Sequence, residues 1–216
     1  MKTIFSGCDS ARAGTLKEGL MRRVVSLLIG AVALVAASAA LAQQALVIRP
    51  LTERKVADLP GGDLFWRIET YPSKDAAQAA AGNWSLVAEA AGKVWLFTLG
   101  SAGGSSQGGT KVAEVGPITR VTAPQYLLRI NEASGPPGSV TPVHSHPGSE
   151  AFYVLVGEQS IRGAHGTLVV KAGTPEPGHG AAMAMQVSSS GSTELQSLVM
   201  FVVDATQPFS SPASLP

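Results

Sequence analysis

Two imidazoles and a carboxylate lie within seven residues of one another, at His144, His146 and Glu150. The two histidines are two positions apart, so in an extended segment both rings point to the same face. Residues 147–149 are Pro-Gly-Ser, which is typical of a tight turn, and the apolar run AFYVLV that follows Glu150 predicts a strand that brings this carboxylate beside the rings. Such a donor set leaves other positions of a divalent metal open, which suits oxygen, water or a bidentate substrate.

The wider spacing around these residues resembles the first motif of the cupin superfamily. That motif runs glycine, five residues, His-x-His, three residues, glutamate, six residues, glycine. It is matched by Gly138, His144, His146, Glu150 and Gly157. The resemblance implies a small antiparallel β-barrel of jelly-roll type, with a metal held inside by the two histidines and the glutamate. The alternative is a pair of surface-loop histidines beside a solvated glutamate.

The second motif of that family is not matched. It should run glycine, five residues, Pro-x-Gly, two residues, histidine, three residues, asparagine. Counted from Gly173, its histidine position falls on Ala184, or on Met185 if one residue is inserted. Two alternatives stay open for a fourth ligand or substrate contact: His179, reaching in from the rim, or Met185, whose thioether would favour copper. Met185 as core filler is the third alternative, and His165 is expected to be a solvated turn residue.

The composition predicts one compact domain. The chain has 216 residues, of which 45% are hydrophobic and 14% are charged, and this is enough to bury a core. Its formal charge is +1, and without residues 1–42 it has eleven basic and thirteen acidic residues, a formal charge of −2. Because no Lys/Arg cluster is present to neutralise phosphates, a nucleic-acid partner is excluded.

The segment 21–42 has the pattern of a secretory signal peptide. Arg22 and Arg23 supply a positive start, residues 24–37 are almost wholly apolar, and Ala-Leu-Ala at 40–42 is a small-x-small cleavage pattern. The alternative is an uncleaved anchor, but the apolar stretch is shorter than the roughly 20 residues of a spanning helix. The expected protein is therefore periplasmic or secreted, with no stable membrane span after cleavage.

Two consequences follow from this segment. Residues 1–20 precede it, which suggests that they are a mis-assigned start and that Met21 is the initiator. Cys8 is the single cysteine, so a mature chain that begins at Gln43 has none. Disulfides and thiolate metal sites are thereby excluded.

The rest of the chain predicts an N-terminal extension over 43–125 that packs on a barrel over 126–204, followed by a tail over 205–216. In the extension, Ser73 is placed as the N-cap of one short helix that stops at Gly82. The tail is rich in proline and serine and is expected to wrap the surface or to be loose.

Strand patterns supply the predicted core. Residues 84–99 read as a hairpin. The alternating side chains of Phe152, Val154 and Val156 are expected to form one core face of the barrel. Residues 195–203 are apolar on both faces, which predicts a strand that is covered on both sides.

The expected fold class is all-β, a cupin-type antiparallel jelly-roll β-barrel with an N-terminal extension containing one short helix. The expected cofactor is a divalent transition metal, with no choice among Fe, Mn, Cu, Ni and Zn. Three functions stay open: a metal-dependent dioxygenase, a non-catalytic module that binds a small molecule or metal, and a degenerate structural barrel. The expected partners are a small-molecule ligand or substrate and a second copy of the chain in a homodimer.

Overall fold

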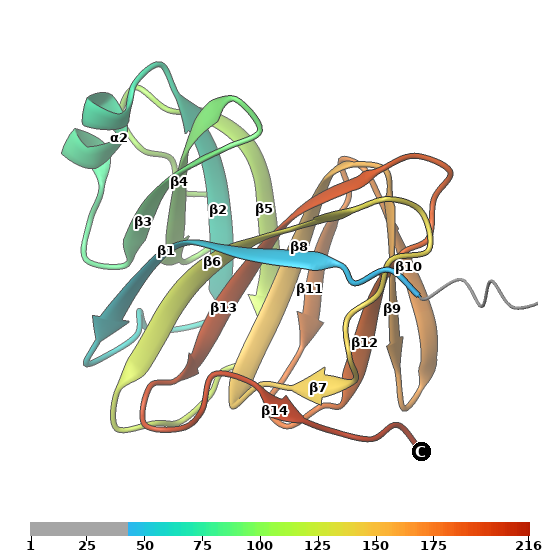
Figure 1. The fold of residues 1–216 in the computed structure, drawn as a ribbon. Coiled ribbons are helices and arrows are strands. Elements are labelled where there is room, and N and C mark those ends of the chain that lie inside the picture. Colours follow the sequence, from blue (N-terminus) through green and yellow to red (C-terminus); the bar gives the residue numbers. More distant parts are fainter. Residues whose placement is uncertain (1–42) are drawn as a thin grey trace, which may run out of the picture. The chain divides into compact units, whose positions relative to one another are not determined.

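The computed structural model describes residues 43–216, and the predicted signal peptide and preceding segment lie outside the described residues. The described part is built from antiparallel strands and one short helix (Figure 1). In chain order the elements are β1 (Val47–Val56), β2 (Leu64–Tyr71), α2 (Lys74–Ala80), β3 (Ser85–Ala90), β4 (Lys93–Gly100), β5 (Thr110–Ile118), β6 (Tyr126–Gly135), β7 (His144–Ser145), β8 (Gly148–Val156), β9 (Glu158–Gly163), β10 (Gly166–Lys171), β11 (Pro175–His179), β12 (Met185–Ser189), β13 (Leu195–Asp204) and β14 (Ser211–Pro212).

No helix among residues 43–216 has the length and apolar character needed to cross a membrane.

The strands form three sheets. The central sheet has the order β1-β6-β13-β8-β11, the second sheet β10-β9-β12-β7-β14 and the third sheet β3-β4-β2-β5. The central and second sheets face each other as the two halves of a jelly roll, and the third sheet packs on the opposite face of the central one (Figure 1). The central sheet is therefore covered on both sides.

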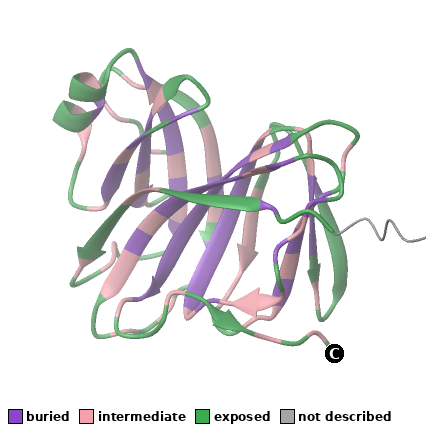
Figure 2. Ribbon diagram, in the orientation of Figure 1, coloured by how far each residue is buried: buried purple, intermediate pink, exposed green. Residues whose placement is uncertain are grey.

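Alternating side chains divide the central sheet between two hydrophobic clusters. On β13, Val199 and Phe201 face the second sheet, whereas Met200 and Val202 face the third sheet. This confirms the prediction that the strand is covered on both faces, and Figure 2 shows the central strands as largely buried. The period of two residues along a strand is the physical cause, because it sends neighbouring side chains to opposite faces.

The predicted core face of β8, formed by every second side chain, does not extend to the end of the strand. Phe152 and Val154 are fully buried, but 48% of Val156 is exposed. On β13, Ser197 pairs with Val154 and the adjacent Gln196 pairs with Val156, so β8 carries one extra residue at this point. Such a β-bulge interrupts the alternation of side chains, which is why the expectation for Val156 was wrong.

The N-terminal part of the described chain forms the third sheet and also joins the barrel. Ser73 caps α2, because its Oγ accepts a hydrogen bond from the Ala76 N–H at 3.2 Å. The helix ends at Ala80 rather than reaching Gly82, because Ala81 is already extended. Residues 43–125 were expected only to pack on the barrel, whereas β1 pairs with β6 and forms an edge strand of the central sheet.

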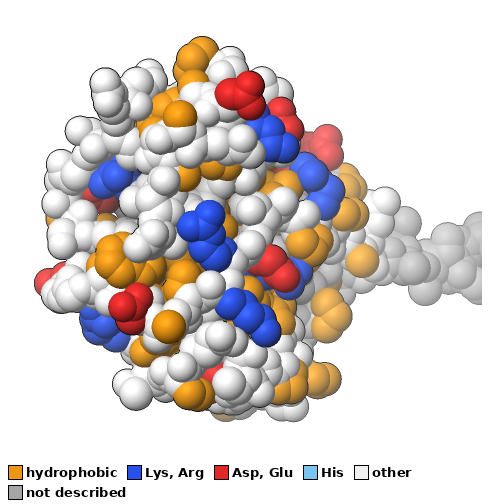
Figure 3. All heavy atoms as spheres, turned by 90° about the vertical axis from the view of Figure 1, so that its left-hand side faces the viewer, with side chains coloured by type: hydrophobic (Ala, Val, Ile, Leu, Met, Phe, Trp, Pro, Cys, Tyr) orange, Lys and Arg blue, Asp and Glu red, His pale blue; other side chains and the backbone are white. Residues whose placement is uncertain are grey.

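The hairpin of β3 and β4 turns at Ala91 and Gly92, which both have positive φ. Figure 3 views the molecule from the side of α2 and β3, and on this face basic and acidic side chains lie interspersed.

Candidate metal centre

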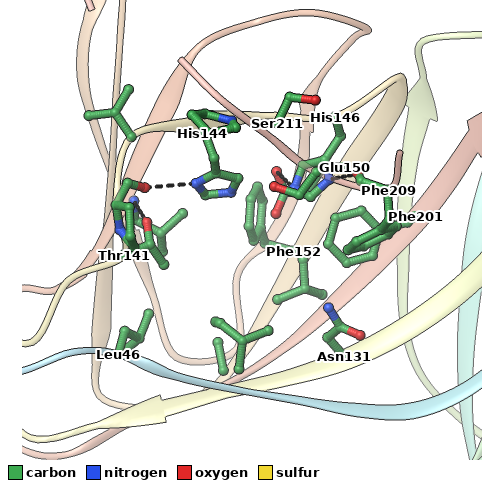
Figure 4. Close-up of a pocket in the computed structure, with 18 residues that line it drawn as sticks. Leu46, Asn131, Thr141, His144, His146, Glu150, Phe152, Phe201, Phe209 and Ser211 are labelled. Atoms are coloured by element: carbon green, nitrogen blue, oxygen red, sulfur yellow. Dashed lines mark hydrogen bonds and ion pairs between the residues drawn. The ribbon is translucent and has the colours of Figure 1, made fainter. Parts of the chain in front are cut away.

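The structure brings the three predicted metal ligands together. His144 lies on β7, His146 follows directly, and Glu150 lies near the start of β8. Each offers one ligand atom, and these atoms all lie within 4.8 Å of one another. The His146 Nε2 is 3.7 Å from the Glu150 Oε2, and both histidines and the glutamate border one hollow (Figure 4).

Backbone carbonyls orient both imidazoles. The His144 Nδ1 lies 2.9 Å from the Pro142 carbonyl oxygen, and the His146 Nδ1 lies 2.6 Å from the Phe209 carbonyl oxygen. A carbonyl only accepts, so each Nδ1 must carry the hydrogen and donate it. The Nε2 of both rings is then left with a free lone pair, which is the form of histidine that binds a metal.

The C-terminal segment closes the site on one side. Ser211 and Pro212 of β14 pair with β7, the strand that carries His144. The Phe209 ring contacts the His146 ring and the Phe201 ring, with centroid distances of 4.8 and 4.9 Å. The tail is therefore part of the site rather than a loose end.

Burial controls the charges of this group. The Glu150 side chain is buried, and its Oε2 has no hydrogen-bond partner. Burial raises the pKa of Glu150 to about 8. Burial also lowers the pKa of His146 to about 4; the hydrogen bond to the Phe209 carbonyl opposes this shift, and nearby His144 and Arg129 add to it. Near neutral pH His146 is therefore uncharged, and the pair of His146 and Glu150 is not an ion pair.

This chemistry fits a divalent transition metal. A buried carboxylate oxygen without a partner is costly unless a cation or a proton compensates it. At metal–ligand distances of about 2.1 Å, the ligands of one ion lie about 3–4 Å apart, and the 3.7 Å between His146 and Glu150 is in this range. Two imidazoles and one carboxylate suit iron, manganese, copper, nickel or zinc and leave coordination positions open.

The three side chains border a cavity of about 390 Å³. The other side chains around it are mostly apolar, and the phenyl rings of Phe152, Phe201 and Phe209 are the largest among them. Its volume lies at the lower end of the range for small-molecule sites. Its lining includes Asn131 on the central sheet, and no lysine or arginine of the described chain lines it.

The other candidate ligands lie elsewhere. His179 on β11 has its Cα opposite that of Glu150, yet its side chain lines a second cavity of about 280 Å³, as does His165. A register shift lies between Glu176 and His179, and such an irregularity re-aims side chains. Met185 is 1% exposed and packs in the hydrophobic cluster between the central and second sheets. Neither His179 nor Met185 lines the cavity at the metal centre.

Glycine allows β11 to lie this close to β8. Gly178 has a φ of +68°, and a Cβ at this position would collide with the Glu150 carbonyl oxygen. Only glycine fits such a close approach of two backbones.

Sequence reasoning missed two contributors to the site. Phe209 acts through its backbone carbonyl, which any residue type carries, so no side-chain pattern could reveal it. Asn131 lies on β6 together with the polar residues Arg129, Glu132 and Ser134, and it is 1% exposed. Because several polar residues share this strand, the sequence alone did not single out Asn131 as the one that faces the cavity.

No family model matches the chain, and no curated protein matches it. Three solved structures illustrate what it is similar to. A cupin superfamily protein from Desulfitobacterium hafniense is 16% identical over 36% of this chain and 68% of that chain, with a TM-score of 0.33. A protein with a double-stranded β-helix domain from Klebsiella pneumoniae is 19% identical over 40% of this chain and 75% of that chain, with a TM-score of 0.36.

The third is an oxalate decarboxylase from Lactobacillus farciminis in complex with formate, 16% identical over 39% of this chain, with a TM-score of 0.34. The match spans about a quarter of that protein, 26% of its chain. All three matches cover less than half of this chain, so its fold is assigned from its own strand pairings. Residues 43–216 form an all-β fold of antiparallel jelly-roll type, as the resemblance carried by His144, His146 and Glu150 implied.

Proposed function

We propose that the protein binds a divalent transition metal through His144, His146 and Glu150, and that it uses the open coordination positions to act on a small organic molecule. The observation that carries this proposal is the convergence of two carbonyl-oriented Nε2 atoms and an unpartnered buried carboxylate oxygen at one cavity. Two histidines and one carboxylate are the ligand set of non-haem iron oxygenases, so we propose oxygen-dependent chemistry. The bound metal would act as a Lewis acid and bind oxygen and substrate side by side.

The chain's own residues have defined tasks in this proposal. The Pro142 and Phe209 carbonyls hold the two rings in the tautomer that presents Nε2. Glu150, protonated near neutral pH because of its burial, gives up its proton when the cation arrives. The apolar wall keeps bulk water from the reacting molecule.

A second function is favoured by a specific observation. Apart from the three proposed ligands, no titratable side chain of the described residues lines the cavity. A reaction that needs a separate general acid or base has none here. A module that binds a metal and a small molecule without turnover is therefore the alternative.

One experiment separates these functions. The purified protein is loaded anaerobically with iron(II), and oxygen uptake is measured with a panel of small phenols and keto acids. Substrate-dependent uptake that is absent in the His144→Ala variant supports the oxygenase. Stoichiometric metal binding without uptake supports the binding module, and a protein that binds none of Fe, Mn, Cu, Ni and Zn refutes both.

We also propose that the protein is exported, as the segment 21–42 suggests. N-terminal sequencing of protein recovered from outside the cytoplasm is expected to give Gln43 as the first residue. An intact N-terminus on that protein would contradict cleavage.

A further inference from the structure

Besides the proposed metal ligand Glu150, Asn131 is the polar side chain that the central sheet contributes to the described lining of the cavity. It lines the cavity on β6 and is 1% exposed. Its Oδ1 accepts a hydrogen bond from the Arg129 Nε–H at 2.9 Å. Because arginine only donates, this contact fixes which end of the amide is oxygen.

The other end of the amide is free to bind a ligand. The Asn131 Nδ2 has no hydrogen bond to any other residue between 43 and 216, and Figure 4 shows this nitrogen turned toward the cavity. The other buried polar side chain in the lining besides the proposed ligands is Thr141, whose Oγ1 accepts from the Val187 N–H at 3.0 Å and which lies outside the central sheet. Asn131 therefore presents a donor, and it lies on a sheet other than the one that carries His144.

The charges around the cavity restrict the ligand further. The guanidinium of Arg129 contacts Asn131 but does not line the cavity. It already has three partners: Asn131, the Glu53 carboxylate at 3.3 Å and the Phe209 ring at 4.2 Å. An anionic group of the ligand placed away from the metal would find no cationic partner, and burying such a charge is costly. The three phenyl rings instead favour a planar apolar body.

We propose that the ligand is a single-ring aromatic molecule with an oxygen for the metal and one further neutral oxygen, such as a carbonyl, that accepts a hydrogen bond from the Asn131 Nδ2. This inference rests on the proposed function, because the metal end of the ligand is defined by His144, His146 and Glu150. It adds the class of the substrate and names Asn131 as the residue that selects it. Phenols whose ring carries a neutral carbonyl belong to this class, and phenols that carry a carboxylate do not.

The test compares matched ligands by calorimetry on the zinc-loaded protein. The probes are 3- and 4-hydroxybenzaldehyde, the corresponding methylphenols, which lack the acceptor, and 4-hydroxybenzoate, which adds a charge. We expect at least one aldehyde to bind about tenfold more tightly than its methylphenol, as one hydrogen bond to a buried donor allows. In Asn131→Leu this ratio is expected to fall to about twofold or less, and 4-hydroxybenzoate is expected to bind more weakly than the aldehyde.

A matched control and a prior metal titration make the result decisive. Ser197→Ala removes a buried polar atom from β13 in the same sheet, away from the cavity lining, and should keep the tenfold ratio. If zinc does not bind, the proposed function fails, and the ratio measured on the metal-free protein still decides the role of Asn131. Equal binding of aldehyde and methylphenol, an unchanged ratio in Asn131→Leu, or no binding by any probe would overturn the inference.

Discussion

The two faces of the central sheet are made by the same strands and serve different purposes. The face toward the third sheet packs against apolar side chains of that sheet, among them Trp95 and Phe97, which are at most 1% exposed. The face toward the second sheet carries a cavity of about 390 Å³ bordered by Glu150 and Asn131. The first face therefore supplies stability, and the second carries an unpartnered buried carboxylate oxygen at a cost in stability.

The stable packing between the central and third sheets matters for the metal centre. A buried carboxylate without a partner destabilises the fold, and proteins hold such groups only where the surrounding structure is stable enough. The third sheet is not part of the barrel, yet it covers the back of β8, the strand that carries Glu150. Changes on the two faces are therefore expected to separate stability from metal binding.

The largest effect is expected on the side of the central sheet that packs against the third sheet. Phe97→Ala should lower the free energy of unfolding by about 3–5 kcal/mol, because it leaves a void among fully buried side chains. Urea unfolding monitored by circular dichroism measures this loss. The folded fraction should keep its metal affinity within a factor of about two, and a large loss of affinity without unfolding would break the proposed division between the faces.

Replacing a proposed metal ligand at the cavity should weaken metal binding and leave the stability of the fold largely unchanged. His146→Ala should weaken metal binding at least about 100-fold, equivalent to about 2.7 kcal/mol, while the protein stays folded. Metal content after dialysis against a fixed free concentration provides the measurement. His179→Ala is the matched control, since His179 lines the second cavity, and its metal content should not change. Full metal content in both variants would refute the ligand assignment.

Removal of the C-terminal tail is expected to have an intermediate effect on metal affinity. A chain that ends at Pro208 lacks the Phe209 carbonyl that accepts from the His146 Nδ1. We expect metal affinity to fall about 10–100-fold, as for other partners that orient a ligand, and the ¹⁵N signals of the His146 ring to show a mixture of tautomers.

Two controls isolate the carbonyl of Phe209. A chain that ends at Ser210 keeps this carbonyl but loses β14, and Phe209→Leu keeps the carbonyl but loses the ring. Both are expected to keep the Nδ1-protonated tautomer and to lose less affinity than the shorter chain. Equal affinity in the full chain and in the chain ending at Pro208 would show that the tail does not orient His146.

A further, pH-dependent effect concerns the stability of the metal-free protein. Glu150 keeps its proton up to about pH 8 when folded, whereas the unfolded chain loses it near its ordinary value of 4.5. The folded state therefore binds more protons in this interval, and the contribution of Glu150 to stability falls as the pH rises from about 4.5 to about 8. Glu150→Gln cannot ionise, so its free energy of unfolding should exceed that of the wild type at pH 8, and this difference should shrink as the pH falls toward 4.5.

Urea unfolding of chelator-treated protein across this pH range measures the difference. Subtracting the two curves removes the contribution of His146, whose pKa is also shifted. Glu194→Gln, which changes an exposed carboxylate, is the control variant. A wild type that is as stable as Glu150→Gln at pH 8 would mean that Glu150 is not an isolated buried carboxyl group.

Local rules accounted for several elements of the fold. The Ser73 cap and the apolar pattern of residues 195–203 depend on short-range chemistry and on strand periodicity, and both predictions were confirmed. The spacing of the two histidines and Glu150 likewise depends only on a strand, a tight turn and a second strand, so their convergence was predictable. The exposure of Val156 was not, because a bulge depends on the pairing with β13.

The sequence by itself determined the covered central strand and the three side chains that meet at one point, because each follows from residue types at short spacing. The jelly-roll class was implied by the resemblance that these residues carry. Only the tertiary structure decided what surrounds them. The carbonyl of Phe209 reaches a ring 63 residues earlier, and Asn131 lines the cavity from β6, a strand distant in sequence from β7 and β8. Contacts between distant segments depend on how whole sheets pack, and a backbone carbonyl is identical at every position.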